Sequence, residues 1–318
     1  FLKNFELDVT YYNAKTMNQT FNPELPVGEY ARIYIQTGAV RNQGLELALN
    51  YNNTWKDFTW NTGVTYSMNK NKILTLADNA INPITREKFS ISSLNMGGLG
   101  STRFILKEGG SMGDIYSLMD LKRDANGAVY IDENNSVVTE SLEANNYIKL
   151  GSVLPKGNLA WRNNFSWKNI NVAFLVSARL GGVVFSRTQA VLDNFGVSEA
   201  SAAARDKGYV SVNGNDRVNP EGWYSVVAGG TAVPQYYIYS ATNIRLQEAS
   251  IGYTIPRKWL GNVCDIKVSL IGRNLWMIYN KAPYDPETVA TVNSYYQGID
   301  YFMSPSTRNI GFNLRLKF

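Results

Sequence analysis

The fold is decided by residues 307–318, TRNIGFNLRLKF, in which apolar and polar side chains alternate with a period of two. One face carries Ile310, Phe312, Leu314, Leu316 and Phe318, and the opposite face carries Gly311, Asn313, Arg315 and Lys317. Because successive strand residues point to opposite sides of a sheet, the segment is predicted to be a strand with one apolar and one polar face. A strand of a soluble sandwich has the same pattern. The aromatic end without a polar tail favours a strand that closes an outer-membrane barrel.

Composition narrows the class of fold. The chain has 318 residues, 44% of them hydrophobic, so it is too long and too apolar to be disordered. Its longest apolar stretch, residues 172–178, is far shorter than the ~18 residues that a membrane-spanning helix needs. Strands of a β-barrel need only about ten alternating residues each, so a β-barrel stays open.

Charge and cysteine content exclude further classes. The net charge is +5, but the Lys and Arg residues are scattered, so no nucleic-acid partner is expected. The expected partner of such a surface is outer-membrane lipid. The single cysteine, Cys264, excludes an intramolecular disulfide. The chain begins with FLKNFELD and not with a secretion leader, so we expect Phe1 to be an internal residue of a longer protein.

Alternation with period two predicts ten strands. They cover residues 4–12, 40–52, 58–69, 102–108, 113–122, 158–168, 170–181, 241–255, 264–278 and 307–318. The phase changes within 241–255, which predicts a bulge near Gln247 and Glu248, and the pattern blurs after Leu270.

The predicted connections alternate between short and long. The short ones are 53–57, 109–112, 168–169 and 256–263, and the long ones are 13–39, 70–101, 123–157, 182–240 and 279–306. Short periplasmic turns and long surface loops are typical of outer-membrane barrels. Ten strands that start from the short-turn side would leave Phe318 at the periplasmic edge.

The polar face of these strands is predicted to line a water-filled lumen. A charge on the lipid side near mid-bilayer costs ~2–4 kcal/mol, so charges repeated strand after strand must face water. The predicted lumen residues are Glu6, Asp8, Glu46, Arg162, Asn164, Arg245, Arg315 and Lys317. Four tryptophans near strand ends, Trp55, Trp60, Trp161 and Trp167, fit either an interfacial girdle or ordinary packing.

Several stretches resemble the SusC/RagA class of TonB-dependent transporters. They are RNQGLELAL (41–49), KLGSVLPKGNLAWRNNFSW (149–167), GYTIP (252–256) with PRKWLGN (256–262), GRNLWMI (272–278), YDPE (284–287) and GFNLRLKF (311–318). The resemblance implies an all-β transmembrane antiparallel barrel of 22 strands, with a plug in its lumen. Residues 1–318 would be the C-terminal part of that barrel and supply its last ten strands.

The same resemblance implies a function and partners. The function is TonB-dependent import of an oligomeric nutrient, an oligosaccharide or oligopeptide, across the outer membrane of a Gram-negative bacterium. The implied partners are a SusD-like surface lipoprotein as lid and the TonB–ExbB–ExbD complex, which would act through a plug and TonB box outside this sequence. Barrel assembly machinery would recognise Phe318, and transporter–lipoprotein pairs would dimerise. A passive porin or a surface adhesin built on a smaller barrel is the alternative.

One segment departs from the family pattern. Where the family often has an Asp-rich, calcium-loop-like sequence, this chain has DANGAVYID (124–132). Asp124, Asn126 and Asp132 match, but the second Asp-Gly pair is replaced, and calcium prefers six to eight oxygen ligands. An Asn-Gly turn is the preferred interpretation and calcium the alternative; no other cofactor is expected.

No enzyme is expected. GGSMG (109–113) matches the nucleophile-elbow pattern, but the chain has no histidine to act as its base, so we predict a tight turn there. The functions that remain are binding of a solute and its passage through the barrel. Aromatic faces beside polar groups grip sugar rings or peptide side chains. The candidate substrate contacts are Asp216, Arg217, Trp223, Tyr224, Tyr295, Tyr296 and Tyr301, whereas Tyr236–Tyr239 is assigned to the outer girdle.

Overall fold

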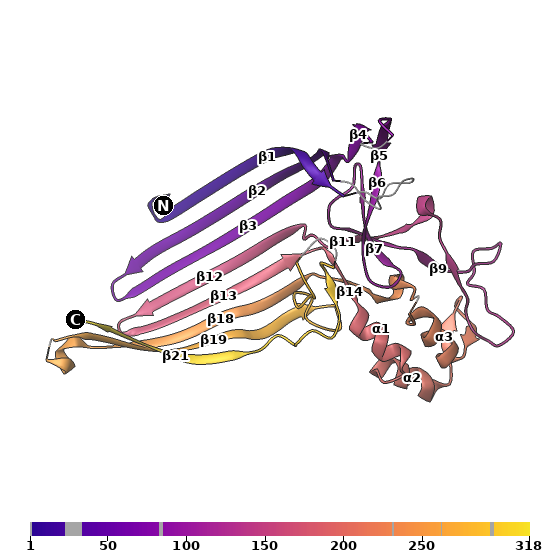
Figure 1. Ribbon diagram of the computed structural model, residues 1–318. Helices are drawn as coiled ribbons and strands as arrows, with labels where there is room; N and C mark the ends of the chain where they lie inside the picture. Colours follow the sequence, from indigo (N-terminus) through magenta and orange to yellow (C-terminus); the bar gives the residue numbers. More distant parts are fainter. Residues whose placement is uncertain (1, 23–33, 83–84, 231, 262, 293–295) are drawn as a thin grey trace.

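A computed structural model describes residues 2–22, 34–82, 85–230, 232–261, 263–292 and 296–318 of the chain. Its largest unit is an eight-stranded sheet in which every strand pairs antiparallel with its neighbour in chain order (Figure 1). The strands are β1 (Phe5–Phe21), β2 (Ile35–Trp55), β3 (Phe58–Thr75), β12 (Gly157–Trp167), β13 (Ile170–Leu180), β18 (Asn243–Ile255), β19 (Asp265–Asn280) and β21 (Asn309–Lys317).

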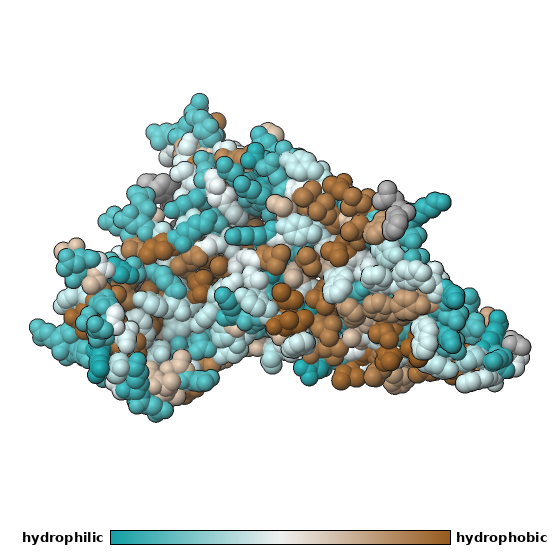
Figure 2. Space-filling model, turned by 180° about the vertical axis from the view of Figure 1, so that it is seen from behind, coloured by the Kyte–Doolittle hydropathy of each residue, from teal (hydrophilic) through white to brown (hydrophobic). Residues whose placement is uncertain are grey.

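The register keeps the apolar side chains of neighbouring strands on one face. Ile251 of β18 pairs with Leu270 of β19, and Leu270 pairs with Phe312 of β21, so three exposed apolar side chains lie in one row. Figure 2 shows apolar side chains gathered over the large sheet, with polar ones over the loops at its far end. We call the side of the sheet that carries this row the apolar face, and the opposite side, which carries Arg162, Arg245 and Arg315, the polar face.

The predicted bulge is confirmed at Gln247. On β13, Leu175 pairs with Glu248 and Val176 with Leu246, which leaves Gln247 without a partner in the ladder. The opposite neighbour β19 compensates at Asn274, which has a left-handed φ of 51°. One extra residue restores the phase of the apolar face, and the irregular β19 backbone beside it explains why the alternation blurs after Leu270.

Three of the four predicted short connections lie at one end of the large sheet, and the long connections lie at the other end (Figure 1). The fourth, 109–112, instead joins two strands of a separate sheet, β7 (Thr102–Lys107) and β8 (Asp114–Ser117). β2 and β3 are joined by Lys56 and Asp57, β12 and β13 by Lys168 and Asn169, and β18 and β19 by a short segment with the turn η4 (Arg257–Leu260). The start of β1 and the C-terminus lie at this short-turn end (Figure 1), which is the end predicted for Phe318.

The long connections carry the remaining elements. The strands are β4 (Ala77–Ile81), β5 (Lys88–Ile91), β6 (Ser93–Gly97), β7 (Thr102–Lys107), β8 (Asp114–Ser117), β9 (Met119–Leu121), β10 (Thr139–Ser141), β11 (Ile148–Ser152), β14 (Val183–Ser186), β15 (Val210–Val212), β16 (Asp216–Val218), β17 (Ile238–Ser240) and β20 (Ile299–Asp300). The helices are α1 (Arg187–Asn194), α2 (Glu199–Lys207) and α3 (Pro220–Val227), with single turns η2 (Ala144–Asn146) and η3 (Pro234–Tyr237); η1 (Leu2–Asn4) precedes β1.

These connections pack together into what we call the loop layer. Its core joins Phe104 from the connection after β3, Phe185 and Val227 from the connection after β13, and Ile299 from the connection after β19. Strand β14 pairs with β17 and β20, which binds two of the connections into one small sheet. The main buried core of the chain therefore lies in the loop layer, beyond the strand ends.

The prediction of ten barrel strands is wrong for the described structure, in which eight strands form the large sheet. Residues 102–108 and 113–122 fall instead on β7, β8 and β9, which belong to small sheets of the loop layer. Consecutive residues are buried along β7 and β8, so both faces of these strands are covered. A barrel strand has one apolar and one polar face, whereas β7 and β8 are covered on both faces. Their sequences therefore alternate less clearly between apolar and polar residues.

The helices of the loop layer were not predicted, although each has an ordinary start signal. Ser186 accepts from the backbone N–H of Gln189 at the start of α1, and Ser198 forms a capping box with Ser201 at the start of α2. Asn219 caps α3, whose first residue is Pro220. No helix in the described ranges is long and apolar enough to cross a membrane.

Aromatic side chains form a belt on the apolar face towards the short-turn end. Ring centroids lie 5.3 Å apart for Tyr51 and Trp60, 6.2 Å for Trp60 and Phe165, and 6.3 Å for Phe165 and Phe174. By register, the four predicted girdle tryptophans all lie on this face.

The assignment of Tyr236–Tyr239 to the girdle is wrong. These residues lie in η3 and β17, inside the loop layer. Tyr237 is fully buried in its core, and its hydroxyl donates to Asp193 at 3.0 Å. A Tyr-rich run is equally consistent with a packed core, and here the packing partners come from distant helices.

Candidate functional site

The polar face of the large sheet holds every predicted lumen residue. Glu6 and Asp8 lie on β1, Glu46 on β2, Arg162 and Asn164 on β12, Arg245 on β18, and Arg315 and Lys317 on β21. The strand register puts all of them opposite the apolar rows described above.

Gly63 of β3 has no side chain, and this allows polar groups on the neighbouring strands to interact across β3. Asn50 of β2 accepts a hydrogen bond of 2.9 Å from Arg162 of β12 and donates a long one of 3.5 Å to Glu6 of β1. Gly63 lies between them, and a Cβ atom there would sit 2.5 Å from the Asn50 oxygen and 2.7 Å from the Arg162 Nε. Glycine at this position therefore leaves room for a polar bridge that spans four strands.

A cavity of about 610 Å³ opens on the polar face. Its charged lining consists of Asp8, Glu46 and Glu287 against one guanidinium, that of Arg179. Arg179 also donates to the carbonyl of Val153 at 2.6 Å, which ties the sheet to the loop layer. The cavity is acidic and suits a polar or cationic solute.

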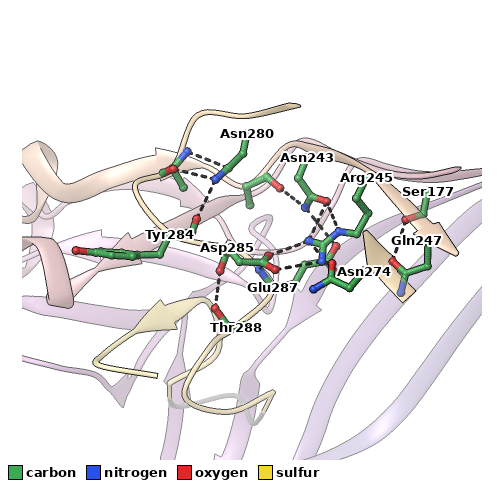
Figure 3. Close-up of polar contacts among 12 residues, drawn as sticks. Ser177, Asn243, Arg245, Gln247, Asn274, Asn280, Tyr284, Asp285, Glu287 and Thr288 are labelled. Carbon is green, nitrogen blue, oxygen red and sulfur yellow. Dashed lines mark hydrogen bonds and ion pairs between the residues drawn. The ribbon is translucent and has the colours of Figure 1, made fainter. Parts of the chain in front are cut away.

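A buried ion pair fixes the connection after β19 to the sheet (Figure 3). Arg245 donates to both carboxylate oxygens of Asp285, at 2.8 and 3.1 Å, and lies 3.3 Å from a Glu287 oxygen. The side chains of Arg245 and Asp285 are only 6% and 8% exposed. Burial alone would raise the pKa of the Asp285 carboxyl, but hydrogen bonds from Arg245 and from the Glu287 backbone hold that pKa below its usual range.

Hydrogen bonds from Asn280 fix the backbone of the segment that precedes Asp285 and Glu287. Its amide donates to the carbonyls of Ala282 and Tyr284 at 2.9 and 3.0 Å and accepts from the Ala282 N–H (Figure 3). Asp285 and Glu287 belong to the YDPE stretch, for which no role was predicted. Their partner lies 40 positions away in sequence, so no local spacing points to the pair.

The structure distributes the candidate substrate residues over three elements. Asp216 and Arg217 lie on β16, and the Arg217 guanidinium lies 4.3 Å from the centre of the Tyr209 ring. Trp223 and Tyr224 lie on α3 and pack against the loop-layer core.

The remaining candidates lie in the connection before β21. Tyr296 and Tyr301 are exposed, and Tyr295 lies outside the described residues. In the described part of the chain, no hydrogen bond or ring contact joins these three groups into one site.

The candidate calcium residues form two successive turns. One Asp124 oxygen accepts from the N–H groups of Asn126 and Ala128, at 2.8 and 2.9 Å, and Gly127 has the left-handed φ of 82° that such a turn requires. Asp132 accepts likewise from Asn134 and Ser136. The preferred Asn-Gly turn is therefore observed. Among the described residues, no three His, Cys, Asp or Glu side chains come together.

GGSMG also forms the predicted turn. Gly109 has a φ of 84°, and the N–H of Gly110 donates to the Lys107 carbonyl at 2.9 Å between β7 and β8.

Comparison with known proteins finds similar sequences over nearly the whole chain. No model of a protein family matches the sequence. Over 98% of its length the chain is 25% identical, across 353 residues, to TonB-dependent receptor P3 of Formosa agariphila, and 27% identical, across 335 residues, to TonB-dependent receptor P26 of the same bacterium. The resemblance to TonB-dependent receptors is confirmed. The chain spans about a third of the length of these curated relatives, 32% of each.

Solved structures agree on the fold. The chain superposes on the RagAB peptide importer in the closed-closed state with a TM-score of 0.72 at 17% identity, covering 100% of this chain and 34% of that one. A structure of the RagAB peptide transporter gives a TM-score of 0.71. The large antiparallel sheet thus has the fold of the corresponding part of these solved structures.

The buried ion pair generates the first prediction. Arg245→Leu leaves the Asp285 carboxylate buried without its cation, so we expect a loss of about 3–5 kcal/mol in unfolding free energy. The control is Arg273→Leu on neighbouring β19, whose partner Glu248 is exposed and whose loss should cost at most about 1 kcal/mol. Guanidinium unfolding of the full-length protein in detergent measures both, and equal losses would contradict a buried clamp.

The pH dependence of the same pair is the second prediction. Because the folded pKa of Asp285 lies below its ordinary value of 3.8, its ionised form stabilises the fold fully above that value. The contribution is lost as the pH falls through the folded pKa. The unfolding free energies of wild type and Asp285→Asn should therefore differ at pH 7 and converge below pH 3.8. A difference that stays constant down to acid pH would rule out this linkage.

Proposed function

We propose that this chain forms part of the wall of a TonB-dependent transporter that imports an oligomeric nutrient, an oligosaccharide or oligopeptide, across the outer membrane. The observation that carries the proposal is similarity to TonB-dependent receptors over 98% of the chain, together with a two-faced antiparallel sheet. Neither observation concerns catalysis, and the proposed role contains no chemical step.

The polar face supports passage of a hydrated solute. Three charged residues of this face, Asp8, Glu46 and Arg179, line the 610 Å³ cavity. The apolar row on the other face carries no charge at Ile266, Val268 and Leu270. A charged wall is stable only where water or a polar ligand covers it. An acidic cavity of this size suits a polar oligomer.

The loop layer supports a partner on the outer surface. Three long connections share one core, and the Arg245–Asp285 pair fixes the third of them to the sheet. A partner protein that acts as a lid could dock on such a packed layer. From the family resemblance we infer that the lid is a SusD-like surface lipoprotein and that the transporter–lipoprotein pairs dimerise.

The remaining elements of the proposal follow the same resemblance. The strands would cross the outer membrane of a Gram-negative bacterium repeatedly, with Phe318 on the periplasmic side and recognised by barrel assembly machinery. The TonB–ExbB–ExbD complex would act through a part of the protein outside residues 1–318.

Energised uptake is the third prediction. Cells that express the full-length protein should accumulate a fluorescent oligopeptide or oligosaccharide, and accumulation should fall to background when tonB is deleted. The protein extracted in detergent should co-purify with a surface lipoprotein. Uptake that is independent of TonB would instead support a passive porin, and surface binding without uptake would support an adhesin; either result contradicts import.

A further inference from the structure

A second cavity, of about 330 Å³, lies where the connection after β19 meets the start of α1. Its lining includes Thr188 of α1, Tyr284 and Asp285 of the YDPE stretch, Asp300 of β20 and Phe302 just beyond it. It is separate from the acidic cavity of the polar face, with which it shares no lining residue.

A buried carboxylate forms the floor of this cavity. Asp300 is only 4% exposed. One of its oxygens accepts from the Ser186 hydroxyl at 2.7 Å, and the other accepts from the Thr188 hydroxyl at 3.0 Å. These donors are neutral, and in the described part of the chain no Lys or Arg pairs with Asp300.

Apolar and aromatic side chains form the rim. Phe302 and Met303 are both exposed, and the Tyr284 ring adds a third group to the lining. The N–H of Phe302 donates to the Thr188 hydroxyl oxygen at 2.6 Å, in a backbone conformation with φ of 50°. Thr188 thus links the carboxylate on the floor to the residue on the rim.

The local charge is unbalanced. Asp285 also lines the cavity, but it shares Arg245 with Glu287. This one guanidinium therefore faces two carboxylates, and among the described residues no salt bridge neutralises Asp300. A buried charge without a counter-charge is costly, and a cation in the cavity would remove that cost. Burial and the nearby Asp300 carboxylate raise the pKa of Tyr284, so its hydroxyl stays neutral and adds no further negative charge.

We propose that this cavity binds the ammonium or guanidinium group of a basic side chain in an oligopeptide. A volume of 330 Å³ accommodates one such side chain, and the Phe302 and Tyr284 rings offer faces for cation–π contact. A metal ion is disfavoured because hard cations require six or more oxygen ligands, and no group of three or more His, Cys, Asp or Glu side chains among the described residues could hold one. The inference rests on the proposed import function and narrows its substrate class to basic peptides.

The test is calorimetric titration of the full-length protein in detergent with trilysine, with trilysine acetylated at its amino groups, with a glucosamine oligomer and with calcium chloride. Trilysine should bind, and acetylation should weaken binding by at least about tenfold, because hydrogen bonds to charged groups would be lost. Asp300→Asn should weaken trilysine binding by a similar factor, and Asp206→Asn, on the exposed surface of α2, should leave it unchanged.

Phe302→Ala provides a second variant, because its exposed ring is not needed for the core; it should also weaken binding. Equal binding of acetylated and free trilysine, or unchanged binding by both cavity variants, would overturn the proposal. Binding of the glucosamine oligomer or calcium in place of trilysine would overturn it as well. TonB-dependent uptake without any preference for basic peptides would leave the proposed import intact and remove only this inference.

Discussion

The alternation of apolar and polar side chains has to stay in register across neighbouring strands, and the rest of the chain depends on this constraint. A slip of one residue would move charged side chains such as Arg162 to the apolar face and apolar ones such as Trp161 to the polar face. The bulge at Gln247 shows how strictly the constraint holds, because one extra residue on β18 returns Ile251 and Tyr253 to the apolar face. The sheet therefore presents one apolar and one polar surface along its whole width.

The loop layer must also be attached to the large sheet, and charged side chains on the polar face of the sheet make this attachment. Arg179 and Arg245 both rise from sheet strands, yet one binds the Val153 carbonyl and the other binds Asp285. Arg245, which was predicted only to line a lumen, and Arg179, for which no role was predicted, therefore attach the long connections to the sheet. The same attachment brings Asp285 next to the cavity whose floor is Asp300, so the clamp and the proposed cation site share one residue.

Much of this architecture could be predicted because it is encoded locally. The period-two strands, the Gln247 bulge and the turn at Asp124–Gly127 each depend on a few consecutive residues. The buried strands β7 and β8 were misassigned because burial on both faces erases alternation. The Arg245–Asp285 pair and the core around Tyr237 depend on partners distant in sequence, for which the chain offers no periodic signal.

The central claim is that the sheet is a membrane wall with opposite environments on its two faces. Nitroxide labels on single cysteines at positions 266–271 of β19, in a Cys264→Ala background of the full-length protein in bilayers, test it directly. Collision rates with oxygen, which partitions into lipid, should peak at Ile266, Val268 and Leu270, and those with a water-soluble nickel chelate should peak at Lys267, Ser269 and Ile271. Two profiles that rise and fall in phase, or that show no period of two, would contradict the account.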